Sequence, residues 1–260
     1  MRTGTHDREI SVAPRKLDVF CTGRAWHVGV AHRGASARHR ESSPEAFEAA
    51  IADGANAVET DVRRTADGVF ICHHDETLTR TAGLDVAVSN LTLDELRRAA
   101  PDEAVQLTDV LERAQRRCNV LLDLKLNGEE DIRSLLALLK SLKADDGIAI
   151  GVRSLHAQAQ IRQLCPDLVQ LGLLENPDQV PHFVSSGGRW VRLWERDAPS
   201  ARIEATQALG VPVLVIVGGP GTDRIVGDID AEGARSLIDR GADGLMLNDP
   251  RVATTAASLA

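Results

Sequence analysis

From about residue 27 onward, short runs of apolar and mostly β-branched residues alternate with longer segments that have helical periodicity. This alternation is typical of a parallel sheet covered by helices. The predicted strands are 27–33, 57–63, 119–125, 148–153, 169–174, 190–194, 212–217 and 243–247. Eight such strands in a chain of 260 residues predict an α/β fold of the TIM (β/α)8 barrel type.

Helix signals lie between these strands. Helical periodicity predicts helices near 129–143, 156–164, 200–209 and 231–240. Two capping boxes predict helix starts, one from Ser42 to Glu45 with Pro44 in the first turn and one from Thr92 to Glu95.

One segment breaks the alternation. The run from Val69 to His73 reads as a strand, but only the turn 66–68 separates it from the strand 57–63. Parallel strands need a crossover of about a dozen residues, whereas an Asp-Gly turn joins antiparallel ones. We therefore expect a hairpin over 64–74 and, after it, an insertion over about 76–107, long enough to narrow a pocket. Residues 1–26 are expected to form an N-terminal extension and 27–260 a single barrel domain.

Composition narrows the function classes. The chain has 30 Lys and Arg against 38 Asp and Glu, a net charge of −8. This balance argues against general binding to nucleic acid or to an anionic membrane, because both need clustered basic residues. The four cysteines form no C-x-x-C pair, and no stretch is as apolar as a signal peptide core or a membrane span. We expect a cytoplasmic protein without stable membrane insertion; the sequence gives no sign of its oligomeric state.

Acidic residues recur on predicted barrel strands. Alternation puts Glu59 and Asp61 on one face of the second strand, and it groups Asp123 with Leu121 and Lys125 on the third. Carboxylates that converge inside a barrel call for a cation, since an unpaired buried carboxylate is costly. Ligand sets made only of oxygen favour Mg²⁺ or Ca²⁺ over zinc. The sequence therefore predicts one divalent cation held by Glu59, Asp61 and Asp123.

Two histidines flank these carboxylates. His32 ends the first predicted strand, and His74 ends the returning arm of the hairpin. A pair of imidazoles that titrate near neutrality suits general acid and base catalysis, with neither role assigned to either residue. Arg33 and Lys125 supply fixed positive charge for the oxygens of a phosphoryl group.

Many separated motifs resemble the glycerophosphodiester phosphodiesterase family, with matching order and spacing. They are His32-Arg33-Gly34-Ala35-Ser36, Glu41, Phe47, Gly54-Ala55, Glu59-Thr60-Asp61-Val62, Thr65-Ala66-Asp67-Gly68, the run from His74 to Thr81, Leu122-Asp123-Leu124-Lys125 and the run from Gly241 to Pro250. The resemblance spans nearly the whole predicted barrel.

The resemblance implies a metal-dependent hydrolase that cleaves a small-molecule phosphodiester to a phosphomonoester, in this family typically glycerol 3-phosphate, and an alcohol. It implies that His32 and His74 are the catalytic acid and base, and that Arg33 and Lys125 bind phosphate. The metal ligands would be Glu59, Asp61 and Asp123. Glu41 matches the glutamate of the family's P-E-N-T box and so belongs to the site. His73 and His74 are adjacent, so strand alternation turns one of the two side chains away from the barrel mouth. Asp75 follows His74 as in the family, which favours His74 as the site residue.

The sequence departs from the family at three places. The P-E-N-T box reads Arg40-Glu41-Ser42-Ser43, without its Pro and Asn. Asp123 stands where glutamate is usual and is shorter by one methylene. The strand 212–217 lacks the family's W-T-V-N sequence, which removes an aromatic wall of the alcohol pocket, and Trp194 at the end of the preceding strand is the expected replacement.

Three other functions are compatible with these residues. A substrate hydroxyl in place of water as the nucleophile would give a cyclic phosphate, as in sphingomyelinase D-type enzymes. Lys125 as a Schiff-base amine would give a barrel aldolase or lyase. A phosphate-binding protein without catalysis is the third, but binding alone does not require two proton-transfer groups.

Overall fold

The computed structural model describes residues 20, 28–126, 128–142 and 147–258. In these residues, eight parallel strands form a closed barrel, in which each strand pairs with its neighbours and β1 pairs with both β9 and β2. The barrel strands are β1 Val28–Ala31, β2 Ala57–Arg64, β4 Asn119–Leu124, β5 Ile148–Val152, β6 Val169–Gly172, β7 Trp190–Trp194, β8 Val213–Ile216 and β9 Gly244–Leu247. The predicted TIM-barrel fold is thus confirmed.

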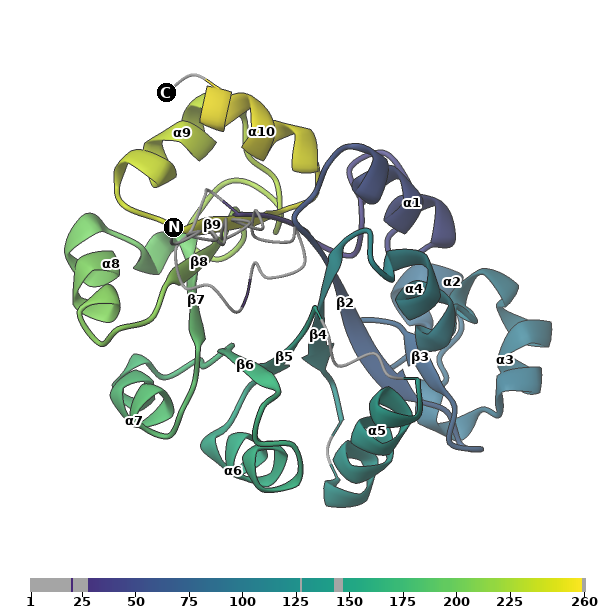
Figure 1. Cartoon of the computed structure of the whole chain (residues 1–260). Helices are drawn as coiled ribbons and strands as arrows, with labels where there is room; N and C mark the ends of the chain where they lie inside the picture. Colours follow the sequence, from purple (N-terminus) through teal and green to yellow (C-terminus); the bar gives the residue numbers. More distant parts are fainter. Residues whose placement is uncertain (1–19, 21–27, 127, 143–146, 259–260) are drawn as a thin grey trace, which may run out of the picture.

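Helices surround this barrel on its outer side (Figure 1). They are α1 Pro44–Ala52, α2 Thr79–Ala82, α3 Leu93–Ala99, α4 Leu107–Ala114, α5 Glu129–Ser141, α6 Leu155–Leu164, α7 Val180–Ser185, α8 Ser200–Gln207, α9 Ala231–Asp239 and α10 Pro250–Ser258. Most barrel strands are buried along their whole length because one face meets the helices and the other fills the barrel interior, which explains their near-continuous apolar sequences.

The core has two main layers. Apolar side chains between the strands and the helices form the larger one, which includes Phe47, Leu122 and Val215. Side chains of alternate strand residues fill the barrel interior, among them Leu121 and Trp190, the latter in edge-to-face contact with Phe20 at 5.8 Å between ring centroids. This packed interior leaves the carboxyl ends of the strands as the place for a site.

The predicted hairpin is present. Strand β3 Phe70–Cys72 pairs antiparallel with the end of β2, with Val62 opposite Cys72. The segment after it packs beside β3 over a small core of its own, which includes Ile71, Leu78 and Leu96 and lies outside the barrel ring in Figure 1. The N-terminal extension expected over 1–26 lies outside the described residues, apart from Phe20.

The two predicted capping boxes have different outcomes. The one at Thr92 is confirmed, since Thr92 and Glu95 exchange hydrogen bonds at the start of α3. The one at Ser42 is wrong: Ser43 is the N-cap of α1 and accepts from the backbone of Ala46, and because an alanine stands at that third helical position no capping box forms. Ser42 lies in the left-handed region, with φ at 57°, which an N-cap residue does not adopt.

Candidate active site

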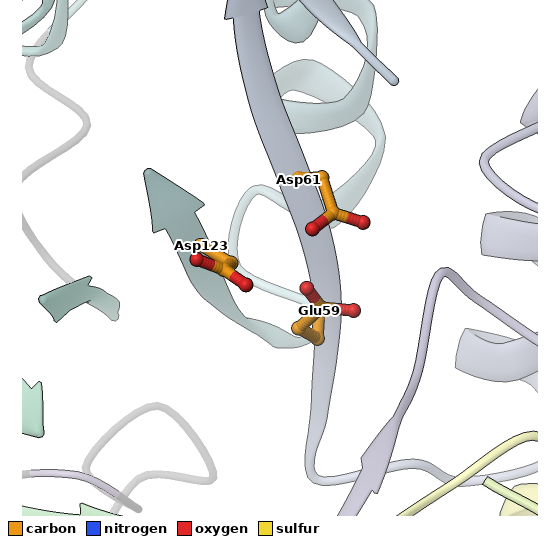
Figure 2. Close-up of side chains that lie close together, drawn as sticks. All are labelled: Glu59, Asp61 and Asp123. Carbon is orange, nitrogen blue, oxygen red and sulfur yellow. The ribbon is translucent and has the colours of Figure 1, made fainter. Parts of the chain in front are cut away.

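Three buried carboxyl groups meet at the carboxyl end of the barrel. Glu59 and Asp61 come from β2, and Asp123 comes from β4, where it lies directly opposite Asp61 in the strand register. Each offers an oxygen that lies within 4.8 Å of the others. Figure 2 shows the three carboxyl groups turned toward one another. Strand alternation explains this convergence, because inward-facing positions of adjacent strands share one layer of the barrel.

Two of the three carboxyl groups have shifted pKa values, in opposite directions. Burial, reinforced by the charges of Asp61 and Asp123, raises the pKa of Glu59 well above its usual value. Burial also acts to raise the pKa of Asp123, but hydrogen bonds from Arg153 and the charge of Lys125 outweigh it and lower this pKa to about 2. The surroundings therefore favour the carboxylate form at Asp123 and disfavour it at Glu59.

The carboxyl cluster fits a divalent metal ion. Oδ2 of Asp61 is buried and accepts no hydrogen bond from the described residues, although Nε of Arg33 lies 3.1 Å away. This oxygen without a hydrogen-bond donor and the raised pKa of Glu59 both indicate that the cluster lacks positive charge. With oxygen donors from all three residues, the set suits a hard cation. Glu59, Asp61 and Asp123 thus form a possible metal site.

His32 follows the end of β1 and is held by Asn248, which follows the end of β9. Its Nδ1 lies 2.9 Å from Oδ1 of Asn248, whose Nδ2 donates to the carbonyl oxygen of Val226. That donation fixes the orientation of the amide, so Nδ1 of His32 must be the donor and Nε2 carries the lone pair. Burial and the charge of Arg33 lower the pKa of His32 to about 4, which keeps the ring neutral at pH 7.

His74 lies at the end of the returning hairpin arm. Its Nδ1 donates to Oδ1 of Asp75 at 2.7 Å, and Asp75 in turn accepts from Arg80 at 2.5 Å. Burial lowers the pKa of His74, although the charge of Asp61 opposes the shift. The adjacent His73 is buried on the other side of the hairpin, where its Nδ1 lies 3.1 Å from Glu103.

Two basic side chains lie among the carboxylates. Nζ of Lys125 lies 3.0 Å from Asp61 and 2.8 Å from Asp123. The backbone N–H of Arg33 donates to Glu59 at 3.0 Å, and its φ of 56° is a left-handed conformation that is unusual for a residue other than glycine. Such a conformation persists because the surrounding contacts hold it, and it turns the Arg33 guanidinium toward the carboxylates.

Most of the predicted site residues line a single cavity of about 240 Å³ at the barrel mouth. They are His32, Arg33, Glu59, Asp61, His74, Asp123, Lys125 and Trp194. Glu41 is not among the lining residues: its carboxylate accepts from Arg33 at 3.1 Å and from Arg80 at 3.0 Å, outside the cavity. A more open groove of about 540 Å³ shares Lys125 and Arg153 with this cavity. The insertion 76–107 contributes no residue to the cavity lining in the described part of the chain, so it does not narrow the cavity.

Sequence comparison matches residues 32–218 to the glycerophosphoryl diester phosphodiesterase family. That segment makes up more than half of the chain and contains most of the side chains that line the cavity. The chain belongs to the glycerophosphoryl diester phosphodiesterase family.

Curated relatives in this family match shorter segments. A glycerophosphodiester phosphodiesterase of Bacillus altitudinis is 32% identical over 106 residues, which cover 37% of this chain and 43% of the relative. One of Caldanaerobacter subterraneus is 39% identical over 69 residues, covering 26% of this chain and 28% of the relative. The alignments therefore span less than half the length of these relatives.

Solved structures share the fold over nearly the full length. A glycerophosphodiester phosphodiesterase from Thermotoga maritima superposes with a TM-score of 0.71 at 22% identity, covering 87% of this chain and 96% of the other. A phosphodiesterase of Oleispira antarctica, solved with the product sn-glycerol 3-phosphate, has a TM-score of 0.76 at 20% identity and covers 89% and 96%. At these identities the likeness shows the family fold.

Three side chains of this family member escaped the sequence analysis. Arg153 and Arg192 line the cavity, and Asn248, which holds His32, lies beyond the segment that matches the family. Strand alternation could have predicted that both arginines face inward. Arg153 continues the inward-facing positions of Ala149 and Gly151 at every second residue, and alternation along β7 applies to Arg192 in the same way. Asn248 lies in the run from Gly241 to Pro250 that resembles the family, but its role as the partner of His32 depends on β9 pairing with β1.

Proposed function

We propose that this protein is a metal-dependent phosphodiesterase that hydrolyses a small phosphodiester to a phosphomonoester and an alcohol. The observation that carries the proposal is the single cavity lined by two imidazoles, three carboxyl groups and the basic side chains of Arg33 and Lys125. Membership of the family supports it. Binding of phosphate alone would not require two histidines whose Nδ1 atoms are both held by acceptors.

In this proposal, Arg33 and Lys125 bind and orient the phosphate oxygens at the cavity wall. Glu59, Asp61 and Asp123 hold a divalent cation, Mg²⁺ or Ca²⁺, which when bound supplies Lewis-acid stabilisation of negative charge on the phosphoryl group. Glu41 fixes the guanidinium of Arg33 from outside the cavity at 3.1 Å. Trp194 packs against the alcohol part of the substrate.

The hydrogen-bond partners divide the proton transfers between the two histidines. His32 is neutral at pH 7 with its Nε2 lone pair available, so it suits the general base that takes a proton from the nucleophile. The carboxylate of Asp75 favours protonation of His74 against the larger effect of burial, and a ring protonated in this way donates from Nε2 to the leaving alkoxide. With water as the nucleophile, the products are a phosphomonoester and an alcohol.

The aldolase alternative is disfavoured by the surroundings of Lys125. Its Nζ pairs with two carboxyl groups at 2.8 and 3.0 Å, and an ammonium held in this way has no lone pair for a carbonyl carbon. The cyclising alternative uses the same residues, with a substrate hydroxyl in place of water, and it differs only in its product.

Phosphorus NMR of the product, with and without metal ions, tests the proposal. We expect hydrolysis of a glycerophosphodiester to give a phosphomonoester resonance, to stop with EDTA and to resume with Mg²⁺ or Ca²⁺. A cyclic phosphate as the product would show that the protein catalyses the cyclising reaction instead of hydrolysis. Full turnover after complete removal of metal ions would overturn the metal requirement, and inactivity toward every diester with every ion would overturn the function.

Two further features bear on where the protein works. Among the described residues, no helix has both the length and the apolar character needed to cross a membrane. Cys72 and Cys165 are free thiols. We propose a cytoplasmic location, because free thiols are typical of a reducing compartment.

A further inference from the structure

Arg192 is an inward-facing cation inside the barrel mouth with incomplete pairing. It lies on β7, only 3% of its side chain is exposed, and it lines the same cavity as the carboxyl cluster. Its Nη1 is buried and has no hydrogen-bond partner among the described residues. A buried guanidinium N–H without an acceptor is costly, so its retention in a cavity points to a ligand.

Trp194, two residues further along β7, lies against this guanidinium. The central carbon of the Arg192 guanidinium lies 4.5 Å from the centre of the Trp194 ring. The contact holds the guanidinium, with its planar edge of N–H donors, at the wall of the cavity. A planar donor edge of this kind matches the two oxygens of a carboxylate or of a phosphate.

The ion pair that Arg192 makes with Glu175 is weak. Nη2 of Arg192 lies 3.5 Å from Oε1 of Glu175, whose side chain is 63% exposed. Glu175 also lies 3.8 Å from Nη1 of Arg153. An ion pair of that length with a solvated carboxylate contributes little and does not offset the burial of a guanidinium. Pairing with Glu175 alone therefore does not account for Arg192.

With the proposed divalent cation bound, the charge of the cavity would exceed what one phosphodiester neutralises. Four cationic side chains line it, against the carboxyl groups of Glu59, Asp61 and Asp123. Arg33, Lys125 and Arg153 pair with those carboxyl groups, whereas Arg192 pairs with Glu175. These side chains leave a balance of +1, a divalent cation would raise it to +3, and a phosphodiester brings one negative charge. A substrate with a second anionic group matches this distribution.

We propose that Arg192, stacked on Trp194, binds a second anionic group of the substrate, a carboxylate or a phosphate carried by one of the two alcohols of the diester. This specificity rests on the phosphodiesterase function proposed above. In the absence of substrate, Glu175 occupies the edge of this subsite. When the anion binds, it displaces Glu175 from Arg192 or shares the guanidinium with it.

Matched pairs of substrates test the subsite. Glycerophosphoserine and glycerophosphoethanolamine differ only by a carboxylate, and glycerophosphoinositol 4-phosphate and glycerophosphoinositol differ only by a phosphate. We expect kcat/KM to be at least about tenfold higher for the anionic member of one pair. The pair that shows the preference identifies the anion as carboxylate or phosphate. Equal values within both pairs would overturn the proposal.

Variants separate the subsite from general electrostatics. Arg192→Met is expected to reduce the preference for the anionic substrate at least about tenfold, whereas Arg196→Met is expected to keep it. Arg196 is a matched control because it follows the same strand, pairs with Asp197 and lies outside the cavity lining. Glu175→Gln removes the competing carboxylate and is expected to strengthen the preference. An equal loss in the Arg192 and Arg196 variants would reduce the effect to net charge and would contradict the proposal.

Binding gives a readout that does not depend on turnover. By calorimetry with the wild-type protein, we expect O-phosphoserine to bind at least about fivefold more tightly than O-phosphoethanolamine if the anion is a carboxylate, or inositol 1,4-bisphosphate more tightly than inositol 1-phosphate if it is a phosphate. We expect the difference to vanish in Arg192→Met. Should the methionine variant not fold, Arg192→Lys keeps the charge without the planar fork and is expected to lose most of the difference. If the protein hydrolyses all the diesters without any preference, only the anion subsite is contradicted. If it hydrolyses none of them, the phosphodiesterase function is contradicted, and calorimetry alone tests whether Arg192 binds an anion.

Discussion

Oδ1 of Asn248 lies 2.9 Å from Nδ1 of His32, although 216 positions separate the two residues in the chain. The contact exists because β9 pairs with β1 and closes the barrel. It fixes which nitrogen of His32 carries the proton and thereby leaves Nε2 facing the cavity as a base. The proposed division of roles between the two histidines depends on this bond.

Replacing Asn248 is expected to alter the pH dependence of the reaction. In Asn248→Asp a carboxylate faces Nδ1 of His32 and favours the protonated ring, so the acidic limb of kcat/KM should move to higher pH. In Asn248→Leu the ring loses its partner, and kcat should fall about 10-fold to 100-fold. Rate profiles from pH 4 to 9 measure both effects. An unchanged profile in the aspartate variant would remove Asn248 from the control of His32.

Each active-site histidine is expected to be essential for turnover. His32→Gln and His74→Gln should each lower kcat by about 10²-fold to 10⁴-fold with the fold intact, as for loss of a general acid or base. His182→Gln, an exposed position on α7, serves as the control and should keep full activity. Circular dichroism checks the fold, and substantial turnover in either cavity variant would exclude that histidine from proton transfer.

Asp123 and Arg153 are expected to affect metal affinity in opposite directions. Arg153 donates to both oxygens of Asp123, from Nε at 3.0 Å and from Nη2 at 2.5 Å, so it competes with a metal ion for the same lone pairs. Asp123→Ala should weaken binding at least about tenfold, whereas Arg153→Met should tighten it. Asp123→Glu, with the ligand length usual for the family, should keep activity with a changed preference among ions. Titration with Mg²⁺, Mn²⁺ and Ca²⁺ measures all three. Weaker binding in Arg153→Met would show that the arginine orients Asp123 instead of competing for it.

The buried His32 is expected to make the metal-free protein sensitive to acid. Its pKa is lowered from 6.5 to about 4 on folding, so the unfolded state binds the proton more readily. The neutral ring thus favours the folded state fully above pH 6.5, and this stability is lost as pH falls toward 4. Between pH 7 and pH 5 the wild type should lose about 2 kcal/mol more than His32→Gln. Urea unfolding in EDTA at both pH values measures the difference, and equal losses in the two proteins would contradict the shifted pKa.

The histidines of the hairpin show where sequence reasoning needed a three-dimensional reference. Alternation along 69–74 requires His73 and His74 to point in opposite directions, but it does not say which one faces the barrel mouth. The pairing of Cys72 with Val62 decides this, since it buries His73 against Glu103 and leaves His74 beside the cavity. A shift of one residue would exchange the two side chains.

The sequence by itself determined the barrel and its carboxyl cluster. Apolar runs fixed the eight strands to within about two residues of their observed ends, and alternation placed Glu59, Asp61 and Asp123 on inward faces, because both signals are local properties of the backbone. Only the tertiary structure decided the partners of these side chains. Arg153 on Asp123 and Asn248 on His32 join elements distant in sequence, and such contacts follow from barrel closure and strand register, which no local pattern encodes.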